Sequence, residues 1–286
     1  MAKEKNTGNH MPQLAYHNRR FLESADARTL RILSEYLGPQ AQFRKAGALD
    51  TVVFFGSARI HPRDVAVRRL RALEARSKGG PAPPAADLKR ARMDVHMSRY
   101  YEAARELSRL VTEWAKQVNK PTRSLMVCSG GGPGIMEAAN RGASEAGGKS
   151  VGLNIKLPME QKPNPYITPE LSMLFRYFFM RKLWFAQPAQ ALIVFPGGFG
   201  TMDEMFEFLT LIQTRKMARR VNIFLYGSKF WKRALNFGWL LESGTISAED
   251  LKLIRFVDSP GQAFGILKDE LGQRFGLRPA IKHPLL

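Results

Sequence analysis

The chain has one cysteine, Cys128, and five histidines among its 286 residues. A single cysteine excludes a framework of internal disulfides. The histidines, at positions 10, 17, 61, 96 and 283, show neither i,i+4 pairing nor the spacing of a ligand cluster. We therefore expect no metal site in this protein.

Long hydrophobic runs are missing as well. No apolar stretch approaches the roughly 20 residues that a bilayer-spanning helix needs, and residues 1–13 contain no apolar signal segment. The composition, 44% hydrophobic and 24% charged, is that of an ordinary globular protein, and a chain of this length can bury a full core. We expect a cytoplasmic protein without a membrane partner.

Acidic residues are few relative to basic ones, 25 against 44, which leaves a formal net charge of +19. Such a charge attracts phosphate-bearing partners, whether nucleotides, nucleic acid or an anionic membrane surface. The basic residues are most concentrated between positions 59 and 92. Because charged runs on helices usually face only water, the charge by itself selects none of these partners.

Two helical segments precede the expected core. Residues 21–37 have helical spacing and end at Gly38-Pro39, which predicts an N-terminal helical extension over residues 1–49. Residues 62–95 form a basic helical insertion, broken by glycines and prolines at 79–84. A core helix is expected over residues 100–118. The whole of 50–286 is predicted to form one Rossmann-like domain.

Short apolar runs alternate with helical patterns along that domain. The predicted strands are residues 51–55, 124–128, 150–155, 191–195 and 221–226. This alternation predicts an α/β fold with a doubly wound, mostly parallel sheet flanked by helices. In such sheets ligands bind outside the carboxyl ends of the strands, so the residues that follow each run are the candidates for function.

Glycine-rich turns follow three of the predicted strands, at residues 56–59, 129–134 and 196–201. Glycine lets the main chain approach an anion closely, and the N-terminus of the following helix favours negative charge. Tight packing explains many single turns of this kind, but three at one sheet edge favour a phosphate site. None fits the dinucleotide or Walker patterns, which disfavours NAD and nucleoside triphosphates.

Ionisable residues lie beside these turns. Arg181 and Lys182 follow an aromatic run, and Asp203, Glu204 and Glu207 begin the helix after the third turn. Acids at a helix start are common because of the helix dipole alone, so Asp203 and Glu207 are interpreted as structural.

Residues 196–204, Pro-Gly-Gly-Phe-Gly-Thr-Met-Asp-Glu, resemble the PGGxGTxxE signature of the LOG family, cytokinin-activating phosphoribohydrolases long labelled lysine decarboxylases. Three other family landmarks recur in order, at residues 55–57, 130–139 and 181–182, so the resemblance covers about residues 50–221. The Met-His pair of short plant-type members is Phe178-Phe179 here, and an N-terminal helix and a longer insertion are added. These features resemble the longer bacterial branch of the family and shift the expected substrate toward AMP or another purine monophosphate.

The resemblance implies hydrolysis of the N-glycosidic bond of AMP or a cytokinin riboside 5′-monophosphate to free base and ribose 5-phosphate, without a cofactor. The implied catalytic residues are Glu204, which stabilises the positively charged ribose and activates water, and Arg181. The implied phosphate-binding residues are Gly197, Gly198, Gly200 and Thr201. The implied ribose- and base-binding residues are Ser57, Gly131, Gly132, Glu137 and Lys182. A homodimer or larger assembly is also implied, with a contact at residues 171–185.

Three alternatives remain open. The protein can instead be a nucleotide-binding regulator that does no chemistry and is recruited to nucleic acid by its charge. Pyridoxal-phosphate decarboxylation needs a lysine for a Schiff base, and Lys182, beside Arg181, is better suited to contact an anion. Cys128 directly precedes the second turn, but no histidine lies near it in any motif, so we interpret it as a core residue.

Overall fold

The centre of the molecule is a seven-stranded parallel sheet with the strand order β4-β3-β2-β1-β5-β6-β7. The computed structural model describes residues 13–48, 50–79, 83–118, 124–158, 162–217 and 221–274. The strands are β1 Asp50–Phe55, β2 Leu125–Ser129, β3 Ser150–Ile155, β4 Ser172–Phe175, β5 Ala189–Val194, β6 Asn222–Tyr226 and β7 Ile254–Val257. The predicted α/β fold, a Rossmann-like parallel sheet flanked by helices, is confirmed.

The five predicted strands correspond to β1, β2, β3, β5 and β6, whereas β4 and β7 were not predicted. The five are buried along almost their whole length, and strands buried on both faces read as continuous apolar runs. The other two are four-residue strands at the sheet edges: β4 alternates buried with exposed or half-buried positions, and β7 has a single buried position, Val257. Their sequences are therefore too short and too mixed in polarity to be recognised as strands.

Helices cover both faces of the sheet. On one face α4 (Ala85–Val118), α5 (Ile135–Glu145) and α11 (Pro260–Arg274) pack against side chains that include Val52 and Phe54 of β1. On the other, α2 (Arg28–Ala46), α6 (Phe178–Ala186), α7 (Phe199–Gln213) and α8 (Ser228–Ala234) pack against side chains that include Val53 and Phe55. The remaining helices are η1 Ala15–His17, α1 Arg19–Glu23, α3 Arg63–Gly79, η2 Pro169–Leu171, α9 Phe237–Glu242 and α10 Ala248–Leu251.

The N-terminal helix does not end at Gly38-Pro39, so that predicted boundary is wrong. Helix α2 continues through Pro39 to Ala46 and ends at Gly47, whose φ of 65° suits a residue without a Cβ. Pro39 has no N–H for the carbonyl of Glu35, four residues earlier. The indole Nε1 of Trp184, on α6, donates to that oxygen at 2.9 Å and replaces the missing bond.

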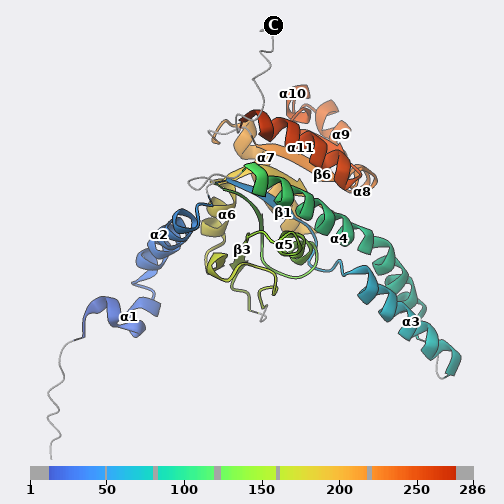
Figure 1. The fold of residues 1–286 in the computed structure, drawn as a ribbon, viewed down its shortest axis with the longest axis horizontal. Helices are drawn as coiled ribbons and strands as arrows, with labels where there is room; N and C mark the ends of the chain where they lie inside the picture. The colour runs from blue at the N-terminus through green and yellow to red at the C-terminus, as the bar shows by residue number, and fades with distance from the viewer. Residues whose placement is uncertain are drawn as a thin grey trace, which may run out of the picture.

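The basic insertion forms a helical hairpin that projects from the body of the molecule (Figure 1). Helix α3 forms the first half of the hairpin. Helix α4 forms the second half and continues into the core as one helix of 34 residues. The second half of the predicted insertion and the predicted core helix are thus continuous, because residues 85–118 contain neither glycine nor proline. Of the helices described, none is long and apolar enough to cross a membrane.

Candidate active site

A cavity of about 670 Å³ opens at the carboxyl ends of the central strands. It lies where β1 separates the two halves of the sheet, the position at which doubly wound sheets bind ligands. Its volume is that of a small-molecule site. The predicted site residues that line it are Ser57, Arg181, Gly198, Gly200, Thr201 and Glu204.

The N-terminus of α7 forms one wall of this cavity. The N–H groups of Thr201 and Met202 both bond the carbonyl of Gly198 at 3.0 Å, whereas those of Phe199 and Gly200 have no carbonyl of a preceding helical turn to bond. A Cβ atom at Gly198 or Gly200 would meet nothing within 4 Å, so the main chain is bare on both sides of Phe199. Such a helix start attracts an anion.

Gly197 has a different role from its neighbours. It does not line the cavity, and a Cβ there would collide with the side chain of Thr201. Thr201 is buried except where it reaches the cavity wall. The bare backbone at Gly197 therefore lets Thr201 take its place in the wall.

Glu204 and Arg181 meet at the bottom of the cavity. Glu204 is 2% exposed, and its Oε1 lies 3.4 Å from Nη2 of Arg181. Its Oε2 has no hydrogen-bond partner, and neither has Nε of Arg181, although both atoms are buried. The guanidinium also lies over the rings of Phe178 and Phe185, at 5.7 and 5.3 Å from their centroids. The pair is held in position but incompletely satisfied.

Burial governs the ionisation of both groups. It raises the pKa of Glu204, against the opposing positive charges of Lys182 and Arg181. It also lowers the pKa of Arg181, against the opposing charge of Glu204. A carboxyl whose pKa is raised in this way accepts a proton more readily near neutral pH than an exposed glutamate does.

Lys182 does not line the cavity but lies behind Glu204. Its Nζ is 2.6 Å from Glu207, 2.9 Å from Asp203 and 4.0 Å from Oε2 of Glu204, the last too far for a hydrogen bond. The two acids interpreted as structural thus bind this lysine. Lys182 acts on the site through its charge.

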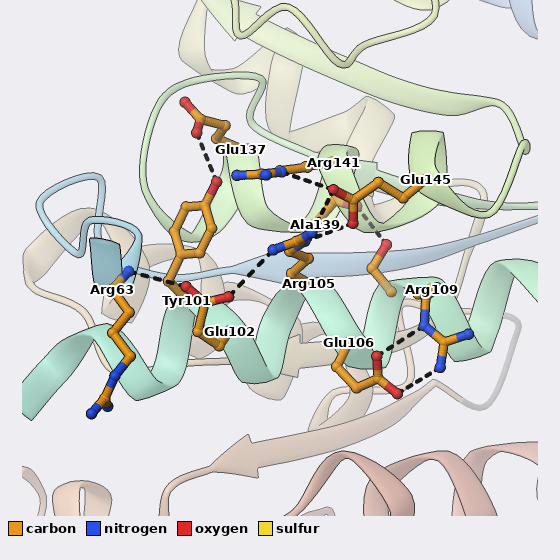
Figure 2. Close-up of polar contacts among 11 residues, drawn as sticks. Arg63, Tyr101, Glu102, Arg105, Glu106, Arg109, Glu137, Ala139, Arg141 and Glu145 are labelled. Atoms are coloured by element: carbon orange, nitrogen blue, oxygen red, sulfur yellow. Dashed lines mark hydrogen bonds and ion pairs between the residues drawn. The ribbon is translucent and has the colours of Figure 1, made fainter. Parts of the chain in front are cut away.

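The second glycine-rich turn is directed away from the cavity at three predicted residues, Gly131, Gly132 and Glu137, none of which lines it. Gly131 has a φ of 72° and its carbonyl accepts from Asn164, as does that of Gly132. Glu137 accepts a 2.7 Å hydrogen bond from the hydroxyl of Tyr101 on α4 (Figure 2). Here the glycines permit a tight turn, and the glutamate ties α5 to α4.

Sequence reasoning missed several residues of the cavity wall. They are Arg59, Gly130, Met136, Asn154, Leu157, Phe178 and Phe199. Asn154 carried a usable signal, because it is a polar residue at the end of a strand predicted to be buried. Among the described residues, no group of three or more His, Cys, Asp or Glu side chains is placed to hold a metal ion.

Cys128 is fully buried at the end of β2, and burial raises the pKa of its thiol. A thiol in this state is a poor nucleophile.

Comparisons with known proteins give one family and a set of solved structures. The family model described as "Possible lysine decarboxylase" matches residues 136–267. No curated protein matches the chain. It is similar to the solved structural-genomics target TM1055, with 19% identity, 77% of this chain and 99% of that chain covered and a TM-score of 0.44.

Two further solved structures are those of a molybdenum cofactor binding protein and a Moco carrier protein. One is the molybdenum cofactor binding protein of the phototrophic bacterium Rippkaea orientalis, with 15% identity, 77% of this chain and 95% of that chain covered and a TM-score of 0.44. The other is the Moco carrier protein of Chlamydomonas reinhardtii, with 18% identity, coverage of 78% and 98% and a TM-score of 0.44. The match of residues 136–267 includes the signature at residues 196–204, so over this part the chain is similar to the LOG family, labelled possible lysine decarboxylases.

Proposed function

We propose that this protein is a nucleoside 5′-monophosphate phosphoribohydrolase. It hydrolyses the N-glycosidic bond of AMP or a cytokinin riboside 5′-monophosphate and releases the free base and ribose 5-phosphate. The observation that carries the proposal is the buried pair at the bottom of the cavity, in which Oε2 of Glu204 and Nε of Arg181 lack partners. A buried polar atom without a partner costs about 1–3 kcal/mol, which a bound substrate would offset.

The phosphate is assigned to the N-terminus of α7. Phe199 and Gly200 offer N–H groups without a helical acceptor, and nothing covers the backbone of Gly198 and Gly200 on the cavity side. The hydroxyl of Thr201 lies in the same wall. Arg59, at the edge of the cavity, adds a positive charge that suits the second negative charge of a monophosphate.

The reaction develops positive charge on the ribose as the bond from C1′ to the base breaks. A carboxylate near C1′ stabilises that charge and accepts a proton from the attacking water. Glu204 is one helical turn beyond the proposed phosphate site, so the ribose of a bound monophosphate extends toward it. Water supplies the new hydroxyl on C1′, and the departing base takes up one proton in exchange for the one that water gave to Glu204.

The family label suggests decarboxylation with pyridoxal phosphate, for which a lysine must reach the cavity. Lys182 is bound by Asp203 and Glu207 and does not line the cavity. Its surroundings support a role as a fixed charge rather than as a Schiff-base lysine.

The test is incubation of the pure protein with AMP, other nucleoside monophosphates and isopentenyladenosine monophosphate, with the free bases measured by chromatography. We expect base release from a purine monophosphate and a loss of at least about 100-fold in kcat for Glu204→Gln, because the general base is removed. Glu207→Gln, which changes a carboxylate outside the cavity, is the matched control. Tight nucleotide binding without base release from any monophosphate would support a nucleotide-binding regulator instead.

We further propose that a second copy of the chain covers the mouth of the cavity. Large apolar side chains are exposed on α6 and α7, namely Phe178, Phe179, Leu183, Phe199 and Phe206; of these, Phe178 and Phe199 line the cavity, and Phe199 is 94% exposed. Monomeric proteins rarely expose such a patch without a partner. Phe179→Ser combined with Leu183→Ser should convert a dimer or larger assembly to monomers in light scattering, whereas a wild-type monomer would contradict the proposal.

A further inference from the structure

The helical hairpin that projects from the molecule, here called the basic arm, comprises residues 63–76 of α3 and 85–99 of α4. Its two helices carry nine basic and four acidic residues, a net charge of five positive. All nine basic side chains belong to exposed residues: Arg63, Arg68, Arg69, Arg71, Arg76, Lys89, Arg90, Arg92 and Arg99.

Most of these charges have no acidic partner. In the arm the ion pairs are Arg68 with Asp64 at 3.0 Å and Arg90 with Asp94 at 3.2 Å. No acid among the described residues pairs with the others: Arg63, Arg69, Arg71, Arg76, Lys89, Arg92 and Arg99. An ordinary solvated helix face carries i,i+4 pairs that neutralise its charges, which the arm largely lacks.

The base of the same helix shows the opposite pattern (Figure 2). Arg105 binds Glu145 through two nitrogens at 2.6 and 2.7 Å, and Arg109 binds both Glu106 and Glu113. Arg141 of α5 also binds Glu145, at 2.9 Å. Where α4 packs in the body of the protein, Arg105 and Arg109 are neutralised, whereas in the arm Arg92 and Arg99 have no acidic partner among the described residues. Along α4 the unpaired positive charge therefore lies in the arm.

A cleft of about 630 Å³ lies where the arm joins the body. Arg63, Arg68 and Arg71 of α3 line one side, and Arg105 and Arg141 line the other. Glu102 accepts from the backbone N–H of Arg63, whose guanidinium extends away from that contact (Figure 2). Asp64 and Glu102 also line this cleft, and Arg68, Arg105 and Arg141 are paired with acids, so within the described part of the chain Arg63 and Arg71 are its unpaired cations.

We propose that the basic arm binds the phosphate backbone of a nucleic acid. From Arg63 to Arg76 the charges extend along about 20 Å of helix, which is longer than a mononucleotide and suits a polymer that carries one charge per about 1.7 Å of duplex. A membrane surface fits less well, because a helix that lies in a membrane needs an exposed apolar face. On α3, Ala66 is fully buried and Leu70 and Leu73 are half-buried, and Met93 on α4, a large apolar residue that is 52% exposed, does not make such a face alone.

The arm begins beside the proposed active site but is separate from it. Arg59 lines the cavity, and α3 starts four residues later. The arm residues beyond Arg63 do not line the cavity. Nucleic-acid binding and base release can therefore be tested independently, and one can fail without the other.

The test measures fluorescence anisotropy of a labelled 20-nucleotide RNA strand and a 20-base-pair DNA duplex with the full chain, over a series of salt concentrations. A plot of log affinity against log salt has a negative slope. Each phosphate contact makes it steeper by about 0.9 on duplex DNA and by about 0.7 on a single strand. With four or five contacts we expect a slope of about −4 on a duplex. Which of the two probes binds more tightly identifies the form of nucleic acid that is preferred.

The decisive variant combines Arg69→Gln, Arg71→Gln and Arg76→Gln. It should lower affinity at least about tenfold at 0.1 M salt and reduce the slope by about 2 to 3, with AMP cleavage unchanged. The control combines Arg44→Gln, Lys45→Gln and Lys216→Gln, which removes the same charge from exposed sites outside the arm. Equal losses in both variants, salt-independent binding, or binding only to phosphatidylserine vesicles would overturn the proposal.

Discussion

Glu204 and Arg181 form a buried ion pair in which each partner keeps one unsatisfied atom. Oε1 of Glu204 lies 3.4 Å from Nη2 of Arg181, while Oε2 and Nε of the two groups have no hydrogen bond. A buried pair stabilises a protein only when its remaining hydrogen-bonding atoms are also satisfied. Both residues line the cavity, so the arrangement favours ligand binding over stability.

The first prediction concerns the pH dependence of base release. A general base works when ionised, and burial raises the pKa of Glu204, so activity should rise with pH through a value above the usual 4.3 or so of a glutamate. Lys182 opposes that rise with its positive charge. Lys182→Met should therefore move the acid limb of kcat/KM to higher pH while leaving the plateau within about threefold.

Its control is Lys252→Met, which removes an exposed lysine paired with Glu249 far along the chain and should leave the acid limb unchanged. An acid limb that moves to lower pH in Lys182→Met would show that Glu204 is not the titrating base.

The second prediction concerns stability. A carboxyl whose pKa is raised by folding contributes stability below its unfolded pKa and loses it as pH rises through the folded value. The variant Glu204→Gln cannot lose a proton. Its Tm relative to that of the wild type should therefore increase as the pH is raised from about 4 to 8, as measured by calorimetry in matched buffers. A difference in Tm that is constant over this range would contradict the raised pKa.

The third prediction separates two glycines of the same turn, Gly197 and Gly200. Gly200 lies in the first turn of α7 with open space at its Cβ position, so Gly200→Ala should stabilise the fold by up to about 1 kcal/mol and weaken AMP binding. At Gly197 an alanine would collide with Thr201, so Gly197→Ala should destabilise the fold. Unfolding in urea and the Kd of AMP are measured for both variants. Unaltered AMP binding in Gly200→Ala would contradict the assignment of the phosphate to this helix start.

The fourth prediction concerns the contact between α2 and α6. Trp184→Phe removes the donor to the Glu35 carbonyl and should cost about 1–3 kcal/mol. In a Pro39→Ala background the alanine N–H can bond that carbonyl, so the same Trp184→Phe change should cost less. Urea unfolding of the four proteins of this double-mutant cycle measures the coupling. Equal costs in the two backgrounds would mean that the indole does not replace the missing helical bond.

Sequence alone was sufficient for the strands and turns whose physical cause is local. β1 and β5 were recognised because strands buried on both faces are continuously apolar, and the glycine-rich turns because only glycine leaves the backbone bare. The motif that ends at Glu204 and the separate landmark at residues 181–182 also named the two residues that meet at the bottom of the cavity. These two residues are 23 positions apart in the chain, and their contact in the interior results from tertiary packing.

Tertiary structure decided which residues of those motifs face the cavity. Gly131, Gly132 and Glu137 belong to the same kind of turn as Gly198 and Gly200 but serve the packing of α5 and its neighbours. Lys182 is adjacent to Arg181 in sequence, yet it binds Asp203 and Glu207 outside the cavity, because consecutive residues on a helix point about 100° apart. A linear motif specifies residue types and spacing, whereas the direction of each side chain depends on how α6 and α7 pack on the sheet.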